Sequence, residues 1–350
     1  MNFILQWFIF FFEYLFSLIF IIYFVQLIHE SGKVIFALLS GYQFVSLNFL
    51  WFTLIRKNQK LRFRIHRTIF DTDSNVVPVK FSSKLKFRPY FYGGIIFDLL
   101  FGTSAGILWY FLPKVSLILR IDLIIFIIVC AFNFLNCLPL NWFGVPTDFK
   151  NISAIKKSPD ALFGYYVSLV ATYLAINEIP LTQYSEKLFY QSPQADHRNF
   201  YVMSQDWLKT AYFEQQVFQN HTGDDLLGYI DQLLPFLNYA PKTIRAQYLN
   251  EAIFIDLIAN YRTKWAIKQW NSSLITHYSM KQNYPTFIKT IILTEIINQK
   301  NKYLQTDFKE GIEILQQAQD QINDLYLLKN LQKKLPEWQV ILRRNHGLNI

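Results

Sequence analysis

A histidine, a glutamate and a lysine stand close together in an otherwise apolar stretch near the N-terminus, in the segment His29-Glu30-Ser31-Gly32-Lys33. On a helix, positions i and i+4 share a face, so an HExxH motif presents two imidazoles to one zinc ion and leaves the glutamate to activate the metal-bound water. Here Lys33 occupies the place of the second histidine. Because ionisable groups are costly at membrane depth, His29 and Glu30 predict a functional site.

A second polar element follows much later in the chain, in the segment NCLPLNWFGVPTDFKN, which contains Asn136, Pro139 and Asp148. It comes directly after an apolar stretch whose end we expect on the same side of the membrane as the first element. Asp148 is therefore expected to contact the helix that carries His29 and Glu30.

The helices that must position these residues are predicted from composition, since 52% of the chain is apolar and 18% is aromatic. About 20 apolar residues, with a rise of about 1.5 Å each, cross a hydrocarbon core of about 30 Å. Three stretches meet this length, at about 3–40, 94–112 and 117–135. The apolar stretch 163–176 is shorter, and we expect it to form a buried helix that starts at Ser158-Pro159.

Two acidic residues within or beside these spans have no role that the sequence defines. Glu13 lies either near the outer interface or toward the bundle, and Asp98 is either a residue at the end of a span or a partner for Arg120.

The segment between the first two spans, about 47–92, is basic and predicts short surface strands. Apolar Leu61, Phe63 and Ile65 alternate with Arg62 and Arg64, and Val79 and Phe81 flank Lys80. It holds ten basic residues against Asp71 and Asp73, which predicts a cytoplasmic location. We interpret the net charge of +9 as this bias plus attraction to anionic lipid, not as nucleic-acid binding.

From residue 151 to 350 polar residues rise, and apolar residues recur at helical spacing, as between Ile312 and Leu328. The predicted fold class is thus mostly α. Residues 1–150 form a three-span transmembrane core with a short surface β segment, and 151–350 form a soluble α-helical domain. That domain is either an array of helical hairpins of the tetratricopeptide type or an ordinary bundle.

At the two polar elements, the chain resembles the site-2 protease family of intramembrane zinc metallopeptidases, in particular small bacterial members with a helical cytoplasmic tail. "LIHESGKVIFALLSGYQF" is similar to the first family motif and "NCLPLNWFGVPTDFKN" to the second. The resemblance implies that His29 and Asp148 are zinc ligands, that Glu30 is the catalytic base, and that Asn136 and Pro139 belong to a family-like loop. It also implies a multi-pass protein of the bacterial cell membrane with a cytoplasmic C-terminal domain.

Two residues depart from the family pattern: Lys33 replaces the second histidine and Phe149 the glycine after the aspartate. A protonated amine has no lone pair for a metal, so we expect a pseudo-protease with little or no zinc, in which Lys33 stands in for the cation. Its partners would be the bilayer and a membrane peptide or protein. The alternatives are an active protease, with zinc at an atypical site, and a membrane-anchored helical interaction protein unrelated to proteases.

Overall fold

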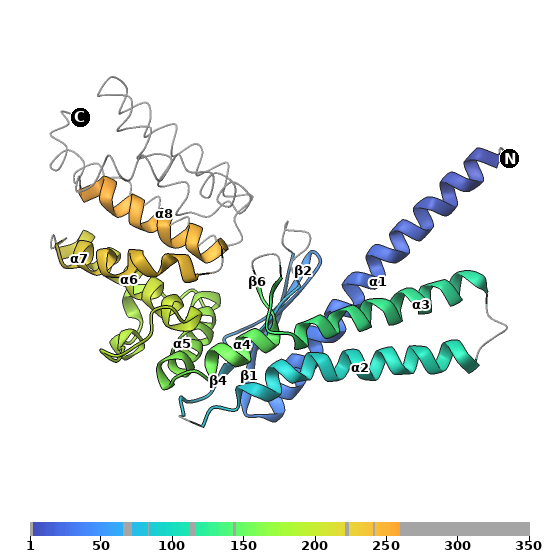
Figure 1. Ribbon diagram of the computed structural model, residues 1–350, viewed down its shortest axis with the longest axis horizontal. Helices are drawn as coiled ribbons and strands as arrows, with labels where there is room; N and C mark the ends of the chain where they lie inside the picture. The colour runs from blue at the N-terminus through green and yellow to red at the C-terminus, as the bar shows by residue number, and fades with distance from the viewer. Residues whose placement is uncertain are drawn as a thin grey trace, which may run out of the picture. The chain divides into compact units, whose positions relative to one another are not determined.

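The computed structural model describes residues 3–65, 72–82, 84–111, 116–142, 145–220, 224–240 and 242–259 (Figure 1). These residues divide between two compact units. The first lies within Met1–Leu162 and Leu169–Asn177, and the second lies within Phe163–Ser168 and Glu178–Ile350.

Three long apolar helices dominate the first unit: α1 (Phe3–Leu39), α2 (Phe87–Phe111) and α3 (Leu117–Asn133), the last continuing as the 3-10 turn η1 (Phe134–Cys137). Helices α2 and α3 run side by side (Figure 1). The backbones of α1 and α2 meet at Gly32 and Gly93, where a Cβ added to either residue would lie 2.4 Å from the carbonyl oxygen of the other. Only glycine allows so close a crossing.

Four helices of the described residues are long and apolar enough to cross a membrane, where the sequence predicted three: Phe10–Leu39, Phe87–Phe111, Leu117–Cys137 and Pro159–Ile176. The helix that we expected to be too short, α5 (Pro159–Ile176), begins ahead of its apolar run and reaches 18 residues. The predicted start was right, because Ser158 Oγ accepts a hydrogen bond from the Ala161 amide at 3.0 Å. The second span begins at Phe87 instead of residue 94, since the polar and aromatic residues before the apolar stretch are helical too.

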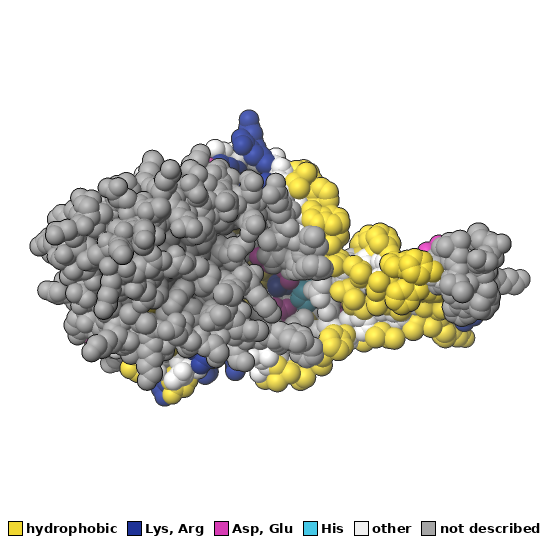
Figure 2. All heavy atoms as spheres, turned by 90° about the horizontal axis from the view of Figure 1, so that it is seen from above, with side chains coloured by type: hydrophobic (Ala, Val, Ile, Leu, Met, Phe, Trp, Pro, Cys, Tyr) yellow, Lys and Arg dark blue, Asp and Glu magenta, His cyan; other side chains and the backbone are white. Residues whose placement is uncertain are grey.

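Many apolar side chains of these helices are exposed, as expected for surfaces that face lipid. Figure 2 shows them covering the helical part of one face. Inside the bundle, Ile21 and Val25 of α1 pack with Cys130 of α3 to form an apolar layer, to which Ile125, Phe126 and Val129 add. A polar pair lies on each side of this layer along α1 and α3: Ser17 with Asp122, at 2.7 Å, and Gln26 with Asn133, at 3.3 Å.

The segment between α1 and α2 forms an antiparallel sheet of β1 (Tyr42–Phe49), β2 (Phe52–Lys57), β3 (Lys60–Ile65) and β4 (Ser74–Pro78). The strand order is β3-β2-β1-β4. The sheet thus begins at Tyr42 instead of residue 47. The predicted strand around Lys80 is wrong, because β4 ends at Pro78 and the chain turns before α2.

After η1, the short hairpin of β5 (Asn141–Trp142) and β6 (Val145–Pro146) leads into α4 (Asp148–Ile155). Thr147 is the N-cap of α4: its hydroxyl accepts a hydrogen bond from the Lys150 amide at 3.4 Å and donates one to the carbonyl oxygen of Leu138 at 2.5 Å. The start of α4 is thereby fixed to the segment that leaves α3.

The described part of the second unit is helical, with α6 (Phe200–Asn220), α7 (Asp224–Leu233), α8 (Lys242–Ala259) and the 3-10 turns η2 (Leu181–Gln183), η3 (Glu186–Phe189) and η4 (Leu234–Tyr239). The helical pattern between Ile312 and Leu328 lies outside the described residues. The tetratricopeptide-like arrangement stays a prediction.

Candidate functional site

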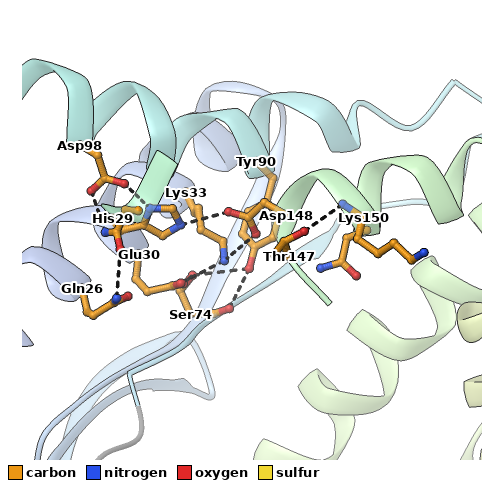
Figure 3. A network of polar contacts seen from close by, with 12 residues as sticks. Gln26, His29, Glu30, Lys33, Ser74, Tyr90, Asp98, Thr147, Asp148 and Lys150 are labelled. Carbon is orange, nitrogen blue, oxygen red and sulfur yellow. Dashed lines mark hydrogen bonds and ion pairs between the residues drawn. The ribbon is translucent and has the colours of Figure 1, made fainter. Parts of the chain in front are cut away.

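His29 of α1 lies between two carboxylates from elements distant in sequence. Its Nδ1 is 2.7 Å from Asp98 Oδ2 of α2, and its Nε2 is 3.0 Å from Asp148 Oδ2 of α4 (Figure 3). The ring and both carboxylates are buried. An imidazolium donates from both ring nitrogens, so a charged His29 satisfies both carboxylates at once.

The space for the His29 ring is created by Gly94 of α2, since a Cβ at that position would lie 2.6 Å from the ring atoms Cε1 and Nε2. Asp98 is held in turn by Asn133 of α3, whose amide nitrogen is 3.3 Å from Asp98 Oδ1. Gln26 donates to Asn133 Oδ1 at 3.3 Å (Figure 3). Three helices therefore fix the ring.

Glu30, one residue along α1, uses both of its oxygens within the protein. Its Oε1 is 3.0 Å from Lys33 Nζ, and its Oε2 accepts a hydrogen bond from Ser74 Oγ at 2.5 Å. Tyr90 of α2 donates its hydroxyl hydrogen to the Ser74 carbonyl oxygen at 2.9 Å, which fixes the start of β4 beside the carboxylate. The side chain of Glu30 is only 9% exposed, so these two contacts are its main hydrogen bonds.

Lys33 is the cation between the two acidic elements. Besides Glu30, its Nζ lies 3.5 Å from Asp148 Oδ1 and 5.3 Å from the centre of the Tyr90 ring. Burial by itself would raise the pKa of Asp148, but the Lys33 ammonium and the His29 hydrogen bond outweigh burial and lower the pKa below its usual range. Asp148 also opens α4, where the helix dipole favours a negative charge.

These contacts define a buried polar cluster made of His29, Glu30, Lys33, Ser74, Tyr90, Asp98 and Asp148. With every group ionised, its three carboxylates face two cations. Such a count favours the charged forms of His29 and Lys33, because each lost proton would leave a buried carboxylate without compensation.

The cluster does not fit zinc as it stands. Within the described residues, no group of three His, Cys, Asp or Glu side chains is arranged to hold a metal ion. Lys33, with its ammonium, stands where an HExxH motif has its second histidine. The ring nitrogen Nε2 of His29 and the carboxylate of Asp148 bond to each other, which leaves no space between them for a shared metal ion. An ion at this place would have to displace Lys33 from both Glu30 and Asp148.

The sequence-predicted residues thus divide into two groups. His29, Glu30, Lys33 and Asp148 come together, whereas Asn136 lies in η1 and Pro139 is exposed, and neither takes part in the contacts that define the cluster.

The two acidic residues left open by the sequence are now placed. Asp98 joins the cluster, while Arg120 stacks on Trp109 with 5.3 Å between the guanidinium and the ring centre. Glu13 is exposed on α1.

Sequence reasoning missed three members or supports of the cluster: Ser74, Tyr90 and Asn133. Each is a polar residue of ordinary type whose partner is far along the chain, so no local spacing indicates it. For Asp98 a signal did exist, since a carboxylate inside an apolar span predicts a polar partner within the bundle.

Comparison with known proteins does not assign a function to this cluster. No protein-family model, curated protein or solved structure matches the chain.

Proposed function

We propose that this protein is a membrane-embedded pseudo-protease, built like a site-2 protease, that holds a membrane peptide or regulates a partner protein instead of cleaving it. The observation that carries the proposal is the position of Lys33, whose ammonium lies 3.0 Å from Glu30 and 3.5 Å from Asp148. In the family that the sequence resembles, a metal ion would sit among these residues. Here the lysine supplies the compensating positive charge.

Catalysis by Glu30 would require a carboxylate oxygen free to take a proton from water. Both oxygens of Glu30 are engaged, one by Lys33 and the other by Ser74. The arrangement therefore favours a binding or regulatory role over hydrolysis.

Three spans, with the basic sheet and the second unit on the cytoplasmic side, complete the proposal. Helix α5 is long enough to cross the membrane, but the contacts at its two ends favour a helix that does not. Asn177, directly after its last residue, accepts a hydrogen bond through its side-chain oxygen from the backbone nitrogen of Asn58 in the β2–β3 turn, at 3.4 Å. The start of α5 follows α4, which opens with the cluster residue Asp148. Both ends of α5 thus adjoin elements on one side of the spans, which supports a helix that does not cross.

The test is the zinc content of the full-length protein, purified in detergent and measured by mass spectrometry of the metal. We expect the wild type to carry far less than one zinc per chain. Lys33→His should bind zinc, because it restores two imidazoles on one helix face. Lys33→Arg, which keeps the cation, is the matched control and should stay low, and adding His29→Ala to Lys33→His should abolish the gain.

Stoichiometric zinc in the wild type, together with cleavage of a membrane substrate that Glu30→Gln abolishes, would overturn the pseudo-protease and establish the active protease. Zinc in Lys33→His that survives His29→Ala would show that the metal binds elsewhere, and the assignment of this site would then fail.

A further inference from the structure

The β2–β3 hairpin has two chemically different faces. Side chains of residues paired across an antiparallel ladder project to the same face. The register pairs Phe52 with Ile65 and Leu54 with Phe63, and the neighbouring pairs are Thr53 with Arg64, Ile55 with Arg62 and Lys57 with Lys60. One face, called the apolar face below, therefore carries Phe52, Leu54, Leu61, Phe63 and Ile65, with Arg56 opposite Leu61 at its end. The other, the basic face, carries Lys57, Lys60, Arg62 and Arg64.

The apolar face is open. On the edge strand β3, Leu61 is 63% exposed, Phe63 79% and Ile65 76%. On β2, Phe52 is 45% exposed. Contiguous apolar surface of this kind marks a site of interaction with a protein or a membrane.

The turn between β1 and β2 is apolar as well. Leu50 and Trp51 form a two-residue turn, in which Leu50 has a φ of 52°. That left-handed conformation suits glycine or asparagine and is rare for a bulky residue. Trp51 is 46% exposed, so the tip offers an apolar ring where a water-facing hairpin would carry polar residues.

The register also shows which way the apolar face points. Leu47 of β1 pairs with both Leu54 of β2 and Ser74 of β4, so these three side chains share one face. Ser74 donates its hydrogen bond to Glu30 of α1. The apolar face is thus the face turned toward the membrane-spanning helices, and the basic face is turned away from them.

From these observations we infer that the β2–β3 hairpin and the Leu50–Trp51 turn form a lipid-binding surface in the bilayer interface, selective for anionic head groups. The apolar face would enter the outer part of the acyl-chain region of the bilayer. The neighbouring helix α1 also exposes apolar side chains that would face lipid. Arg and Lys on the other face extend their charged ends to the head groups. Charge complementarity points to anionic lipid, because residues 42–65 hold five basic side chains and no acidic one.

The test uses nitroxide spin labels at the consecutive positions 61 to 65, one at a time, in the full-length protein with Cys130→Ala and Cys137→Ser. The protein is placed in nanodiscs of phosphatidylcholine alone, or with phosphatidylglycerol as a third of the lipid. Accessibility to oxygen, which enters the bilayer, is compared with accessibility to a water-soluble nickel complex. Labels at Phe16 of α1 and Lys187 of η3, both exposed, provide the lipid and water references.

We expect labels at Leu61, Phe63 and Ile65 to resemble the Phe16 reference, and labels at Arg62 and Arg64 to resemble Lys187. The label at Phe63 should move deeper when phosphatidylglycerol is present. That shift should vanish in a variant with Lys57, Lys60, Arg62 and Arg64 changed to Gln.

Nickel access at all five positions would overturn the inference, because the hairpin would then lie in water. Labels at Leu61, Phe63 and Ile65 that are immobile and shielded from both reagents would overturn it in favour of a protein partner. An alternating pattern that is the same with and without phosphatidylglycerol would overturn the selectivity for anionic lipid.

Discussion

The imidazole of His29 lies directly over Gly94, so closely that a Cβ there would be 2.6 Å from two ring atoms. The ring cannot retreat, because its nitrogens are held by Asp98 and Asp148. A glycine of α2 is therefore part of the site although it contributes no functional group.

Gly94→Ala should destabilise the first unit, by about 1–3 kcal/mol for an overpacked core. Gly106→Ala, on the same helix, is the matched control, since nothing lies within 4 Å of its added Cβ and alanine is the better helix former by up to about 1 kcal/mol. The buried thiol of Cys130 reports unfolding through its reaction with a fluorogenic maleimide on heating, in a Cys137→Ser background. Equal melting temperatures for the two alanine variants would contradict the close packing.

Lys33→Met should destabilise the same unit more strongly, by about 3–5 kcal/mol, because it leaves Glu30 and Asp148 without their shared cation. The Cys130 thiol assay measures the loss. Lys84→Met, at an exposed position of the same unit, serves as the control and should change stability by less than about 0.5 kcal/mol. Adding Glu30→Gln to Lys33→Met should recover part of the loss, and no recovery would argue against ionic compensation.

The membrane topology can be tested with single cysteines at Asn58 of the β2–β3 turn and Asn238 of η4, both exposed. In intact cells neither should react with a membrane-impermeant thiol reagent, whereas both should react after lysis. Labelling of Asn238 alone from outside would mean that α5 crosses the membrane as a fourth span. Labelling of Asn58 would reverse the orientation of the basic sheet.

In the second unit, the stability of α6 should depend on pH through His197. The hydrogen bond of its Nδ1 to the buried Asp206, at 2.7 Å, raises the pKa of His197 and outweighs partial burial, which lowers it; the charge of Asp196 adds to the rise and that of Lys209 opposes it. Because the folded pKa lies above the unfolded value of about 6.5, the stabilisation is complete below that pH and is lost as the pH rises through the folded pKa.

Hydrogen exchange of α6, measured by mass spectrometry in the wild type and in His197→Gln at each pH, isolates this contribution. Protection should be higher in the wild type at acidic pH, and the difference should shrink toward alkaline pH. Gln191 and Tyr229 also donate to Asp206, at 2.6 and 2.8 Å, and stay in place in both proteins. A difference that does not change with pH would contradict the assignment.

The long helices were predictable from sequence because apolar composition over 17 or more residues has few other solutions. The ends of α1 were placed within one residue, whereas the start of α2 was placed too late because Arg88 and Tyr90 weaken the apolar signal. The sheet was expected from the alternation around Phe63, but its start was placed at residue 47 instead of Tyr42, since Tyr42 and Val45 are buried without a period-two pattern.

The candidate site was predictable only where its residues stand in a fixed local spacing, as His29, Glu30 and Lys33 do. The closeness of Asp148 followed from the expected topology of the spans. Ser74 and Asn133 enter through tertiary packing, and nothing in their neighbourhood along the chain distinguishes them from other polar residues.

The apolar layer of Ile21, Val25 and Cys130 divides the polar side chains inside the bundle into two groups. Buried charges joined by hydrogen bonds form a chain along which protons can move, and in a membrane such a chain threatens to dissipate the ion gradient. The layer separates the Gln26–Asn133 pair from the Ser17–Asp122 pair by a stretch of packed apolar side chains. In the three-span arrangement that we propose, this layer would interrupt a hydrogen-bonded path for protons across the membrane.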